Sequence, residues 1–293
     1  MCPICKSLTA LVIGLPKIST KAAQVIKQNY QIVKCSFCGS YFVNPQINLS
    51  LDEWRILYDQ NYFPQMSRWY EKNRARERLK RFNNIIKYSS NPIKNFLDVG
   101  CGEGFCLIEA NSRGWNAYGV DITDNRISQA KKNGIKFFNS NLIDSKFPGD
   151  FFDVVYMDSV LEHIINPHEY LLEIKRILKK GGIFYLGIPN EDSLLNDVKK
   201  IAYKILSKNI SPKLKPFESP YHVVGFNNKS IRYALEKIQL KIKKLRNFAC
   251  RVEFLKAKPF SREFFHSALL LPIYLLAIPL RREVYMETYV QKQ

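Results

Sequence analysis

The 293-residue sequence lacks an apolar run long enough to cross a lipid bilayer. Its most apolar stretch, residues 268–280, has 13 residues, whereas a membrane-spanning helix needs about 20. No secretory leader is visible either, because cysteines and lysines interrupt the first 30 residues. We therefore expect a cytoplasmic protein that does not span a membrane.

Acidic side chains are scarce, with 26 Asp and Glu against 45 Lys and Arg and a formal net charge of +19. Residues 1–95 carry 15 basic and 5 acidic side chains, residues 96–190 carry 10 and 12, and residues 191–293 carry 20 and 9. Basic flanks could attract nucleic acid, anionic lipid or an anionic substrate. A general bias of the composition towards lysine explains them equally well, so charge alone selects no partner.

The central segment begins with residues 95–104, Asn-Phe-Leu-Asp-Val-Gly-Cys-Gly-Glu-Gly. The pattern predicts a buried strand, a tight glycine turn and the start of a helix. Asp121 ends a second predicted strand 21 residues after Gly100, where a carboxylate can accept both hydroxyls of a ribose. Asp98 would repel a pyrophosphate but suits an ammonium or sulfonium. Taken alone, the stretch also fits an NAD site or an ordinary strand–helix turn.

Two Cys-x-x-Cys pairs, Cys2 with Cys5 and Cys35 with Cys38, can supply four thiolates to a tetrahedral zinc ion. Two disulfides are the alternative, although each pair would close only a tiny loop. Four cysteines leave no open coordination position, so we expect a structural zinc. A small N-terminal lobe also needs such a staple.

The rest of the central segment alternates predicted strands and helices, which indicates a parallel doubly wound sheet. The expected strands are 95–99, 116–120, 135–138, 151–157, 183–188, 240–248 and an antiparallel 282–290. The expected helices are 104–113, one capped by Thr123 or Asp124 that ends at Asn133-Gly134, 168–180 stopped by Gly181-Gly182, and 228–239.

The motif from Asp98 to Gly104, Asp-x-Gly-x-Gly-x-Gly, resembles the first motif of class I S-adenosylmethionine (SAM)-dependent methyltransferases. Residues 152–167 and 178–182 resemble the fourth-strand motif and the post-helix glycine pair of the subgroup that includes ubiquinone and menaquinone methyltransferases. These motifs cover residues 92–190, about a third of the chain. The segment through Pro45 resembles a zinc ribbon that precedes the catalytic domain in one group of these enzymes.

The resemblance implies an α/β fold with a Rossmann-like seven-stranded methyltransferase sheet, mostly parallel with an antiparallel last strand, and a small N-terminal zinc ribbon. The implied domains are a zinc ribbon at 1–47, a helical lid or linker at 48–91, and a catalytic domain at 92–293 with a substrate-cap insertion at 190–228. A solvated helix packed on the sheet is the alternative to the lid. We expect the proline-bearing insertion to be long and irregular.

The resemblance also implies a set of SAM-binding residues. They are Asp98, Gly100, Cys101, Gly102, Gly104, Asp121, Ile122, Asn141, Leu142, Asp158 and Tyr62. Asn141 stands where the family usually has an aspartate that contacts the adenine amino group, and an amide oxygen can still accept that hydrogen bond.

Methyl transfer from SAM needs mainly proximity and orientation, but an oxygen nucleophile also needs a base. His222 and His163 are the candidate catalytic residues, and we expect His222 to be partly exposed. A packed histidine and a hydrogen-bonded loop histidine are the alternatives. No Asn-Pro-Pro-Tyr or Asp-Pro-Pro-Tyr run follows the fourth predicted strand, which disfavours methylation of DNA bases.

The predicted function is methyl transfer from SAM to a small-molecule, saccharide or lipid-linked acceptor. An RNA methyltransferase that grips RNA with the ribbon and the basic flanks is one alternative, and a non-catalytic SAM-binding protein is another. Residues 268–282 could give weak, peripheral contact with an anionic membrane. Burial of residues 268–280 in the core or in a dimer interface is the simpler expectation.

Overall fold

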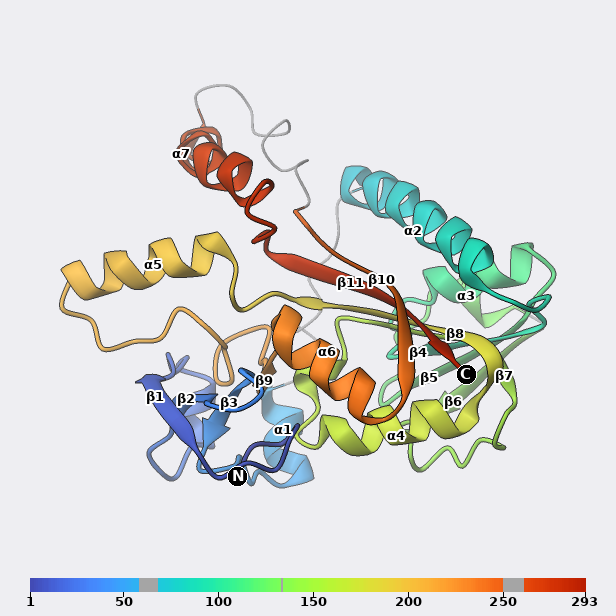
Figure 1. Cartoon of the computed structure of the whole chain (residues 1–293), viewed down its shortest axis with the longest axis horizontal. Coiled ribbons are helices and arrows are strands. Elements are labelled where there is room, and N and C mark those ends of the chain that lie inside the picture. Colours follow the sequence, from blue (N-terminus) through green and yellow to red (C-terminus); the bar gives the residue numbers. More distant parts are fainter. Residues whose placement is uncertain (58–67, 133, 250–260) are drawn as a thin grey trace.

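The computed structural model describes residues 1–57, 68–132, 134–249 and 261–293. A four-stranded sheet formed largely by the N-terminal residues lies beside a seven-stranded sheet (Figure 1). Residue 62, predicted to lie near the methionine end of SAM, is outside the described residues.

The larger sheet has the order β10-β11-β8-β7-β4-β5-β6. Its strands are β4 (Asn95–Val99), β5 (Asn116–Asp121), β6 (Ile135–Asn139), β7 (Phe152–Asp158), β8 (Leu178–Pro189), β10 (Leu240–Phe248) and β11 (Tyr285–Lys292). Neighbouring strands from β8 to β6 are parallel, whereas β11 is antiparallel to both of its neighbours. The predicted fold class is therefore confirmed.

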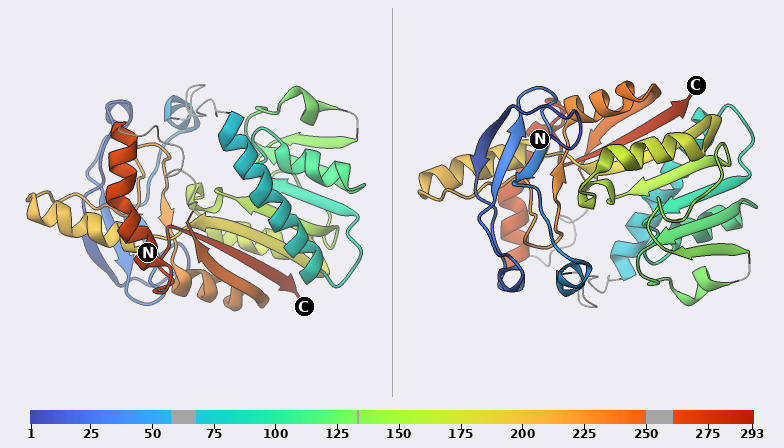
Figure 2. Two further views of the ribbon diagram at one scale, coloured as in Figure 1. Left: turned by 90° about the horizontal axis from the view of Figure 1, so that it is seen from above. Right: turned by 90° about the horizontal axis from the view of Figure 1, so that it is seen from below.

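Helices cover both faces of this sheet (Figure 2). α2 (Arg68–Tyr88) and α3 (Phe105–Ser112) lie on one face, and α4 (Pro167–Ile177) and α6 (Asn228–Lys237) lie on the other. Adjacent strand residues point to opposite faces. Phe96 accordingly packs with Phe82 of α2, whereas Leu97 belongs to the core cluster that contains Leu171 and Ile174 of α4.

The smaller sheet has the order β1-β2-β3-β9, with β1 (Ala10–Gly14), β2 (Gln31–Cys35), β3 (Tyr41–Asn44) and β9 (Val224–Gly225). A 3-10 turn, η1 (Ala22–Gln24), and α1 (Leu51–Leu57) complete the N-terminal elements. β9 comes from the predicted insertion and pairs with β3 through Tyr41–Gly225 and Phe42–Val224. The end of the insertion is thus an edge strand of the N-terminal sheet.

Two local predictions were wrong. The helix expected to run to residue 180 ends at Ile177, and Gly181 and Gly182 lie inside β8. The helix expected after Thr123 is only a short 3-10 turn, η2 (Ser128–Lys131). The Asp124 carboxylate accepts hydrogen bonds from the Arg126 backbone and guanidinium, a local arrangement that competes with helix formation.

The segment 190–228 is less irregular than predicted. It contains α5 (Leu194–Ile205), which Ser193 caps by accepting a hydrogen bond from the Asn196 N–H. Residues 268–280 were expected to be buried in the core or in a dimer interface, and burial in the core is wrong. They contribute to α7 (Arg262–Ala277), which rises from the body of the molecule, and Ala277 is the one buried side chain among those described in this helix (Figure 1). Within the described ranges, no helix combines the length and apolarity that a bilayer crossing requires.

Candidate active site and metal centre

Most of the predicted SAM-binding residues lie at one edge of the large sheet. Gly100 follows β4, Asp121 ends β5 and Asp158 ends β7. Because these strands are parallel, their carboxyl ends meet at the same edge, where ligands bind in open α/β sheets. Asp98, one residue before the end of β4, is close enough to Asp121 and Asp158 for their charges to raise its pKa.

The glycine loop has two crowded positions and one open position. A Cβ atom on Gly100 would lie 2.4 Å from Val160 Cγ2, and one on Gly104 would lie 2.5 Å from Ala130 Cβ. Both glycines also have positive φ angles, so they are needed for the turn itself. Gly102 has φ +50°, and no described heavy atom beyond its chain neighbours lies within 4 Å of where its Cβ would stand. This position leaves room for a ligand to approach the backbone.

Asp121 fastens the loop to β5. Its carboxylate accepts hydrogen bonds from the Gly102 N–H at 2.9 Å and the Thr123 N–H at 3.1 Å. Burial raises the pKa of this carboxyl, while the backbone donors oppose that shift. The next side chain, Ile122, is 67% exposed at the same edge. Carboxylate oxygens have further acceptor capacity for hydroxyl groups.

Asp98 is a buried carboxyl at the foot of the loop, with 4% of its surface exposed. Burial raises its pKa well above the usual range, the nearby Asp158 and Asp121 raise it further, and Arg78 opposes them. Within the described ranges no residue donates a hydrogen bond to this side chain. A cation bound beside it would favour its charged form.

The remaining predicted SAM residues lie in different environments. Asn141 forms a local turn, in which its Oδ1 accepts from the Asp144 N–H at 2.9 Å and its Nδ2 donates to the Asp144 carboxylate at 2.5 Å. Leu142 is buried. Cys101 is also buried, and burial raises the pKa of its thiol.

Arg81 of α2 contacts the site and was missed by sequence reasoning. Its Nη1 donates to Asp158 Oδ2 at 2.5 Å and to the Tyr156 hydroxyl at 3.0 Å. Tyr285, at the start of β11, donates its hydroxyl to Asp158 Oδ1 at 2.7 Å. Two elements far from β7 in sequence therefore hold the Asp158 carboxylate. In a helix rich in arginine and lysine, nothing in the sequence distinguishes Arg81 from its neighbours.

The two candidate bases lie together beyond β7. His163 ends the 3-10 turn η3 (Leu161–His163), and its ring centroid is 4.9 Å from that of His222. His222 Nε2 lies 3.8 Å from Glu162 Oε1, and the Val223 N–H donates to the Glu162 backbone carbonyl at 2.8 Å. The structure thus brings together two residues that are 59 positions apart, and it adds Glu162 beside them.

All three of these side chains are shielded from solvent. Burial lowers the pKa of His163 to about 4 and that of His222 well below its usual 6.5, and the neighbouring His163 and Lys215 lower the latter further. Burial raises the pKa of Glu162 to about 8. The neutral forms are therefore favoured at pH 7. We expected His222 to be partly exposed, and 15% of its side-chain surface is accessible to solvent.

The Glu162, His163 and His222 ligand atoms lie within 4.8 Å of one another, so this group could also hold a metal ion. The four N-terminal cysteines form a second and more regular group.

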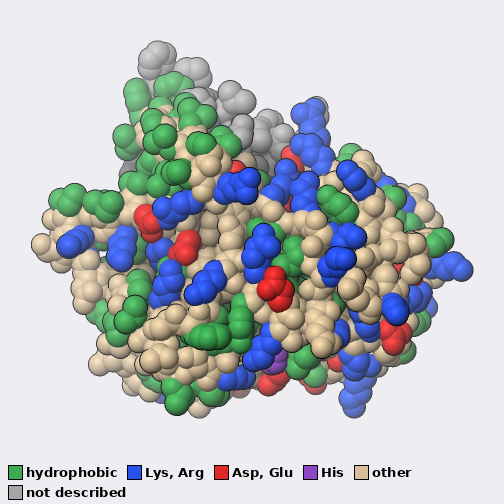
Figure 3. Space-filling view, in the orientation of Figure 1, with side chains coloured by type: hydrophobic (Ala, Val, Ile, Leu, Met, Phe, Trp, Pro, Cys, Tyr) green, Lys and Arg blue, Asp and Glu red, His purple; other side chains and the backbone are tan. Residues whose placement is uncertain are grey.

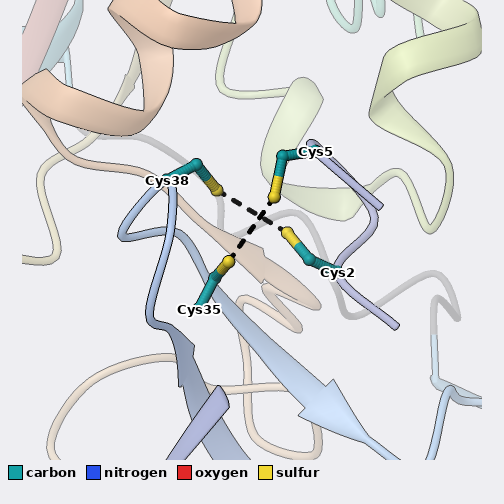
Figure 4. A group of neighbouring side chains, drawn as sticks. All are labelled: Cys2, Cys5, Cys35 and Cys38. Atoms are coloured by element: carbon teal, nitrogen blue, oxygen red, sulfur yellow. Dashed lines mark hydrogen bonds between the residues drawn. The ribbon is translucent and has the colours of Figure 1, made fainter. Parts of the chain in front are cut away.

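The sulfurs of Cys2, Cys5, Cys35 and Cys38 point towards a common centre (Figure 4). Cys2 Sγ lies 3.6 Å from Cys38 Sγ, and Cys5 Sγ lies 3.5 Å from Cys35 Sγ. A tetrahedral zinc ion with Zn–S bonds of about 2.3 Å separates its sulfurs by about 3.8 Å. A disulfide would need about 2.05 Å. The arrangement therefore fits a four-thiolate zinc site.

A family model for the methyltransferase domain matches residues 59–245. The chain belongs to the methyltransferase domain family. This match spans more than half of the chain and confirms the resemblance to class I SAM-dependent methyltransferases. It also places the glycine loop, Asp121 and the histidine pair inside the matched region.

An individual protein similar to this chain agrees with that family assignment. The ubiquinone biosynthesis O-methyltransferase of Rickettsia prowazekii (strain Madrid E) is 28% identical over 137 residues, which are 42% of this chain and 54% of the relative. The chain spans about half the length of the curated relatives it matches.

Two solved structures share the fold of this methyltransferase. A SAM-dependent methyltransferase from Archaeoglobus fulgidus aligns with 82% of this chain and 100% of its own, at 19% identity and a TM-score of 0.52. The geranyl diphosphate C-methyltransferase of Streptomyces coelicolor A3(2) aligns with 80% of this chain and 88% of its own, at 13% identity and a TM-score of 0.52. At these identities, the likeness concerns the fold alone.

Proposed function

We propose that this methyltransferase transfers a methyl group from SAM to a small-molecule or lipid-linked acceptor. The observation that carries the proposal is the open Gly102 position, whose N–H donates to the Asp121 carboxylate, in the loop that follows the buried Asp98. SAM, when bound, supplies a methyl group on an already activated sulfonium leaving group.

The residues at the sheet edge fit the parts of SAM. The buried Asp98 carboxyl lacks a hydrogen-bond donor among the described residues, and the positively charged methionine end of SAM would favour its ionised form. Asp121 would accept the ribose hydroxyls. Asn141 would receive the adenine amino group on the Oδ1 lone pair that Asp144 does not use.

The proposed acceptor class is supported by the proteins that this chain resembles. One is named for ubiquinone biosynthesis and another for geranyl diphosphate, so both names refer to small molecules with isoprenoid parts. Saccharide acceptors belong to the same class of soluble or lipid-linked small molecules. The sequence alternatives, an RNA substrate and a non-catalytic SAM-binding role, become outcomes of the test below.

For an oxygen acceptor, we assign proton removal to His222 and give His163 the next place. A neutral imidazole can accept a proton, and the lowered pKa keeps His222 in that form at pH 7. Glu162 Oε1 lies 3.8 Å from His222 Nε2, so this carboxyl group is within reach of the imidazolium that results.

The four cysteines are proposed to hold one structural zinc ion. Zinc would link the residues before β1 to the β2–β3 connection of the smaller sheet. β9, the edge strand of that sheet, begins two residues after His222. The ribbon would therefore support the loop that carries the proposed base, without taking part in the chemistry.

Incubation of the purified protein with methyl-labelled SAM and separate pools of lipid extract, sugar nucleotides and RNA tests the function. We expect label to appear in a lipid or sugar-nucleotide pool, and to require native protein. Label confined to RNA would replace the proposal with the RNA alternative. Measurable SAM binding without transfer to any pool would favour the non-catalytic role.

A further inference from the structure

Helix α5 is amphipathic, yet its apolar face is not covered. None of its residues is buried, and the exposed fractions of Ile201 and Ile205 are 62% and 77%. Val198, Ile201 and Ile205 have the i, i+3, i+7 spacing of one helix face. Leu206, just beyond the helix, is exposed as well. Such a face normally packs against a core or a partner.

Helix α7 carries a second uncovered apolar stripe. Phe265, Leu269 and Leu276 follow the i, i+4, i+11 spacing of one helix face, and each has more than half of its surface exposed. The sequence from residue 264 to residue 280 contains no Asp, Glu, Lys or Arg. Leu275 and Leu280 extend the exposed apolar area towards the end of this segment.

The two helices belong to one side of the molecule. α5 and α7 contact each other, and the Leu194 N–H at the start of α5 donates to the Arg282 carbonyl at 2.9 Å. Arg282 in turn forms an ion pair with Asp197 of α5. The exposed residues Val198, Ile201, Ile205, Leu206, Phe265, Leu269, Leu275, Leu276 and Leu280 are called the α5–α7 surface below.

Positive charge surrounds this surface. Figure 3 shows the apolar side chains of α7 projecting above a zone of Lys and Arg side chains. Lys199, Lys200 and Lys204 are exposed on α5, and Arg281 is exposed directly after the apolar segment. These residues lie within the segment 191–293, which has 20 basic and 9 acidic side chains.

We propose that the α5–α7 surface attaches the protein to an anionic lipid bilayer. An apolar helix face with flanking Lys and Arg is the composition of interfacial helices, whose apolar side enters the boundary between headgroups and acyl chains. α7 has 16 residues and a length of about 24 Å, so it would lie in the interface and not cross the bilayer.

A second copy of this chain fits the surface less well. Symmetric pairing through α5 and α7 would bring two basic surfaces together in a chain with a net charge of +19. Anionic lipid instead complements that charge.

The α5–α7 surface lies on the side of the molecule where the candidate active site is found. The segment after α7 leads directly to Tyr285, whose hydroxyl contacts Asp158 at the candidate active site. A bilayer on the α5–α7 surface would therefore lie on the side of the molecule where the site is found. The inference goes beyond the proposed function, because lipid attachment can be measured without any methyl transfer.

Flotation of the full chain with vesicles tests the proposal. Vesicles of phosphatidylcholine alone are compared with vesicles that also contain about 30% of the anionic lipid phosphatidylglycerol, roughly the anionic fraction of a natural membrane. We expect binding to the anionic vesicles, weakened at high salt because the electrostatic part is screened. The variant Leu269→Glu/Leu276→Glu and the variant Ile201→Glu/Ile205→Glu should each lower binding by about tenfold or more.

Leu172→Glu is the matched control, since Leu172 of α4 is also exposed, at 45%, but lies away from α7 (Figure 1). It should bind like the unaltered chain. Circular dichroism and retained SAM binding establish that each variant is folded. Equal recovery of the unaltered chain from both vesicle types and from buffer would overturn the proposal. Vesicle-independent dimerisation that the Leu269→Glu/Leu276→Glu variant abolishes would assign the surface to a second copy.

Discussion

Replacement of His222 by alanine should lower turnover by about 10²–10⁴-fold, the usual contribution of a lost general base. SAM affinity should stay unchanged, because His222 packs with His163 and Glu162 and is proposed to face the acceptor and not the nucleoside. Single-turnover assays with the acceptor found in the labelled-SAM screen would measure the first quantity, and calorimetric titration would measure the second.

The pH dependence of the unaltered enzyme follows from the same assignment. A base must be neutral to act, and burial lowers the pKa of His222 well below 6.5. Turnover should therefore hold as the pH falls from 8 to 6.5, and should be lost only when the pH drops further and the imidazole gains a proton. His222→Ala should lack this acid limb.

His168→Ala provides a matched histidine substitution on α4, outside the histidine pair, and should keep both the rate and the acid limb. A His222→Ala variant that keeps the metal content of the unaltered chain would separate a base from a metal ligand. Activity of His222→Ala within about threefold of the unaltered enzyme would remove His222 from the mechanism.

Protein purified without chelator should contain close to one zinc ion per chain. Structural zinc bound by thiolates contributes about 10–16 kcal/mol at pH 7. Removal of zinc, or the substitution Cys35→Ser, should therefore unfold the N-terminal sheet and make its peptide bonds accessible to protease. Because β9 pairs with β3, turnover should fall with it, whereas SAM binding at the distant glycine loop should survive.

Cys106→Ser is the control for this experiment, since Cys106 is a free thiol of α3 outside the four-cysteine group. Its zinc content should equal that of the unaltered chain, as measured by elemental analysis. A metal-free protein whose N-terminal sheet resists protease would contradict the zinc assignment.

The large sheet could be predicted from the sequence because its central strands are short, continuous apolar runs that are buried on both faces. β4 matches its prediction at both ends, β5 and β6 differ from theirs by one residue at one end, and β7 differs by one residue at each end. β9 could not be predicted, because it has two residues and its partner β3 lies about 180 positions earlier. The exposure of α7 could not be predicted either, since an apolar sequence pattern does not indicate whether the helix packs against a core.

Part of the candidate site could likewise be predicted from the sequence, and part could not. Asp98, the glycines and Asp121 lie on consecutive strands, so their spacing was enough to predict that they meet. Arg81 and Tyr285 reach Asp158 only because α2 and β11 pack beside β7 and β8 in three dimensions. The burial of His222 likewise depends on β9 and η3, neither of which has a sequence signal of its own.

Titration of SAM into Gly102→Ala and Gly114→Ala tests the central claim, that SAM binds against the glycine loop, most directly. Both glycines have positive φ angles, and neither has a described non-adjacent heavy atom within 4 Å of its Cβ position, so alanine should cost each about 1–2 kcal/mol of stability. Of these two glycines, Gly102 is the one whose N–H donates to the Asp121 carboxylate. Gly102→Ala should bind SAM at least about tenfold more weakly than the unaltered chain, whereas Gly114→Ala should bind it normally. Unchanged SAM affinity in both variants would contradict that claim.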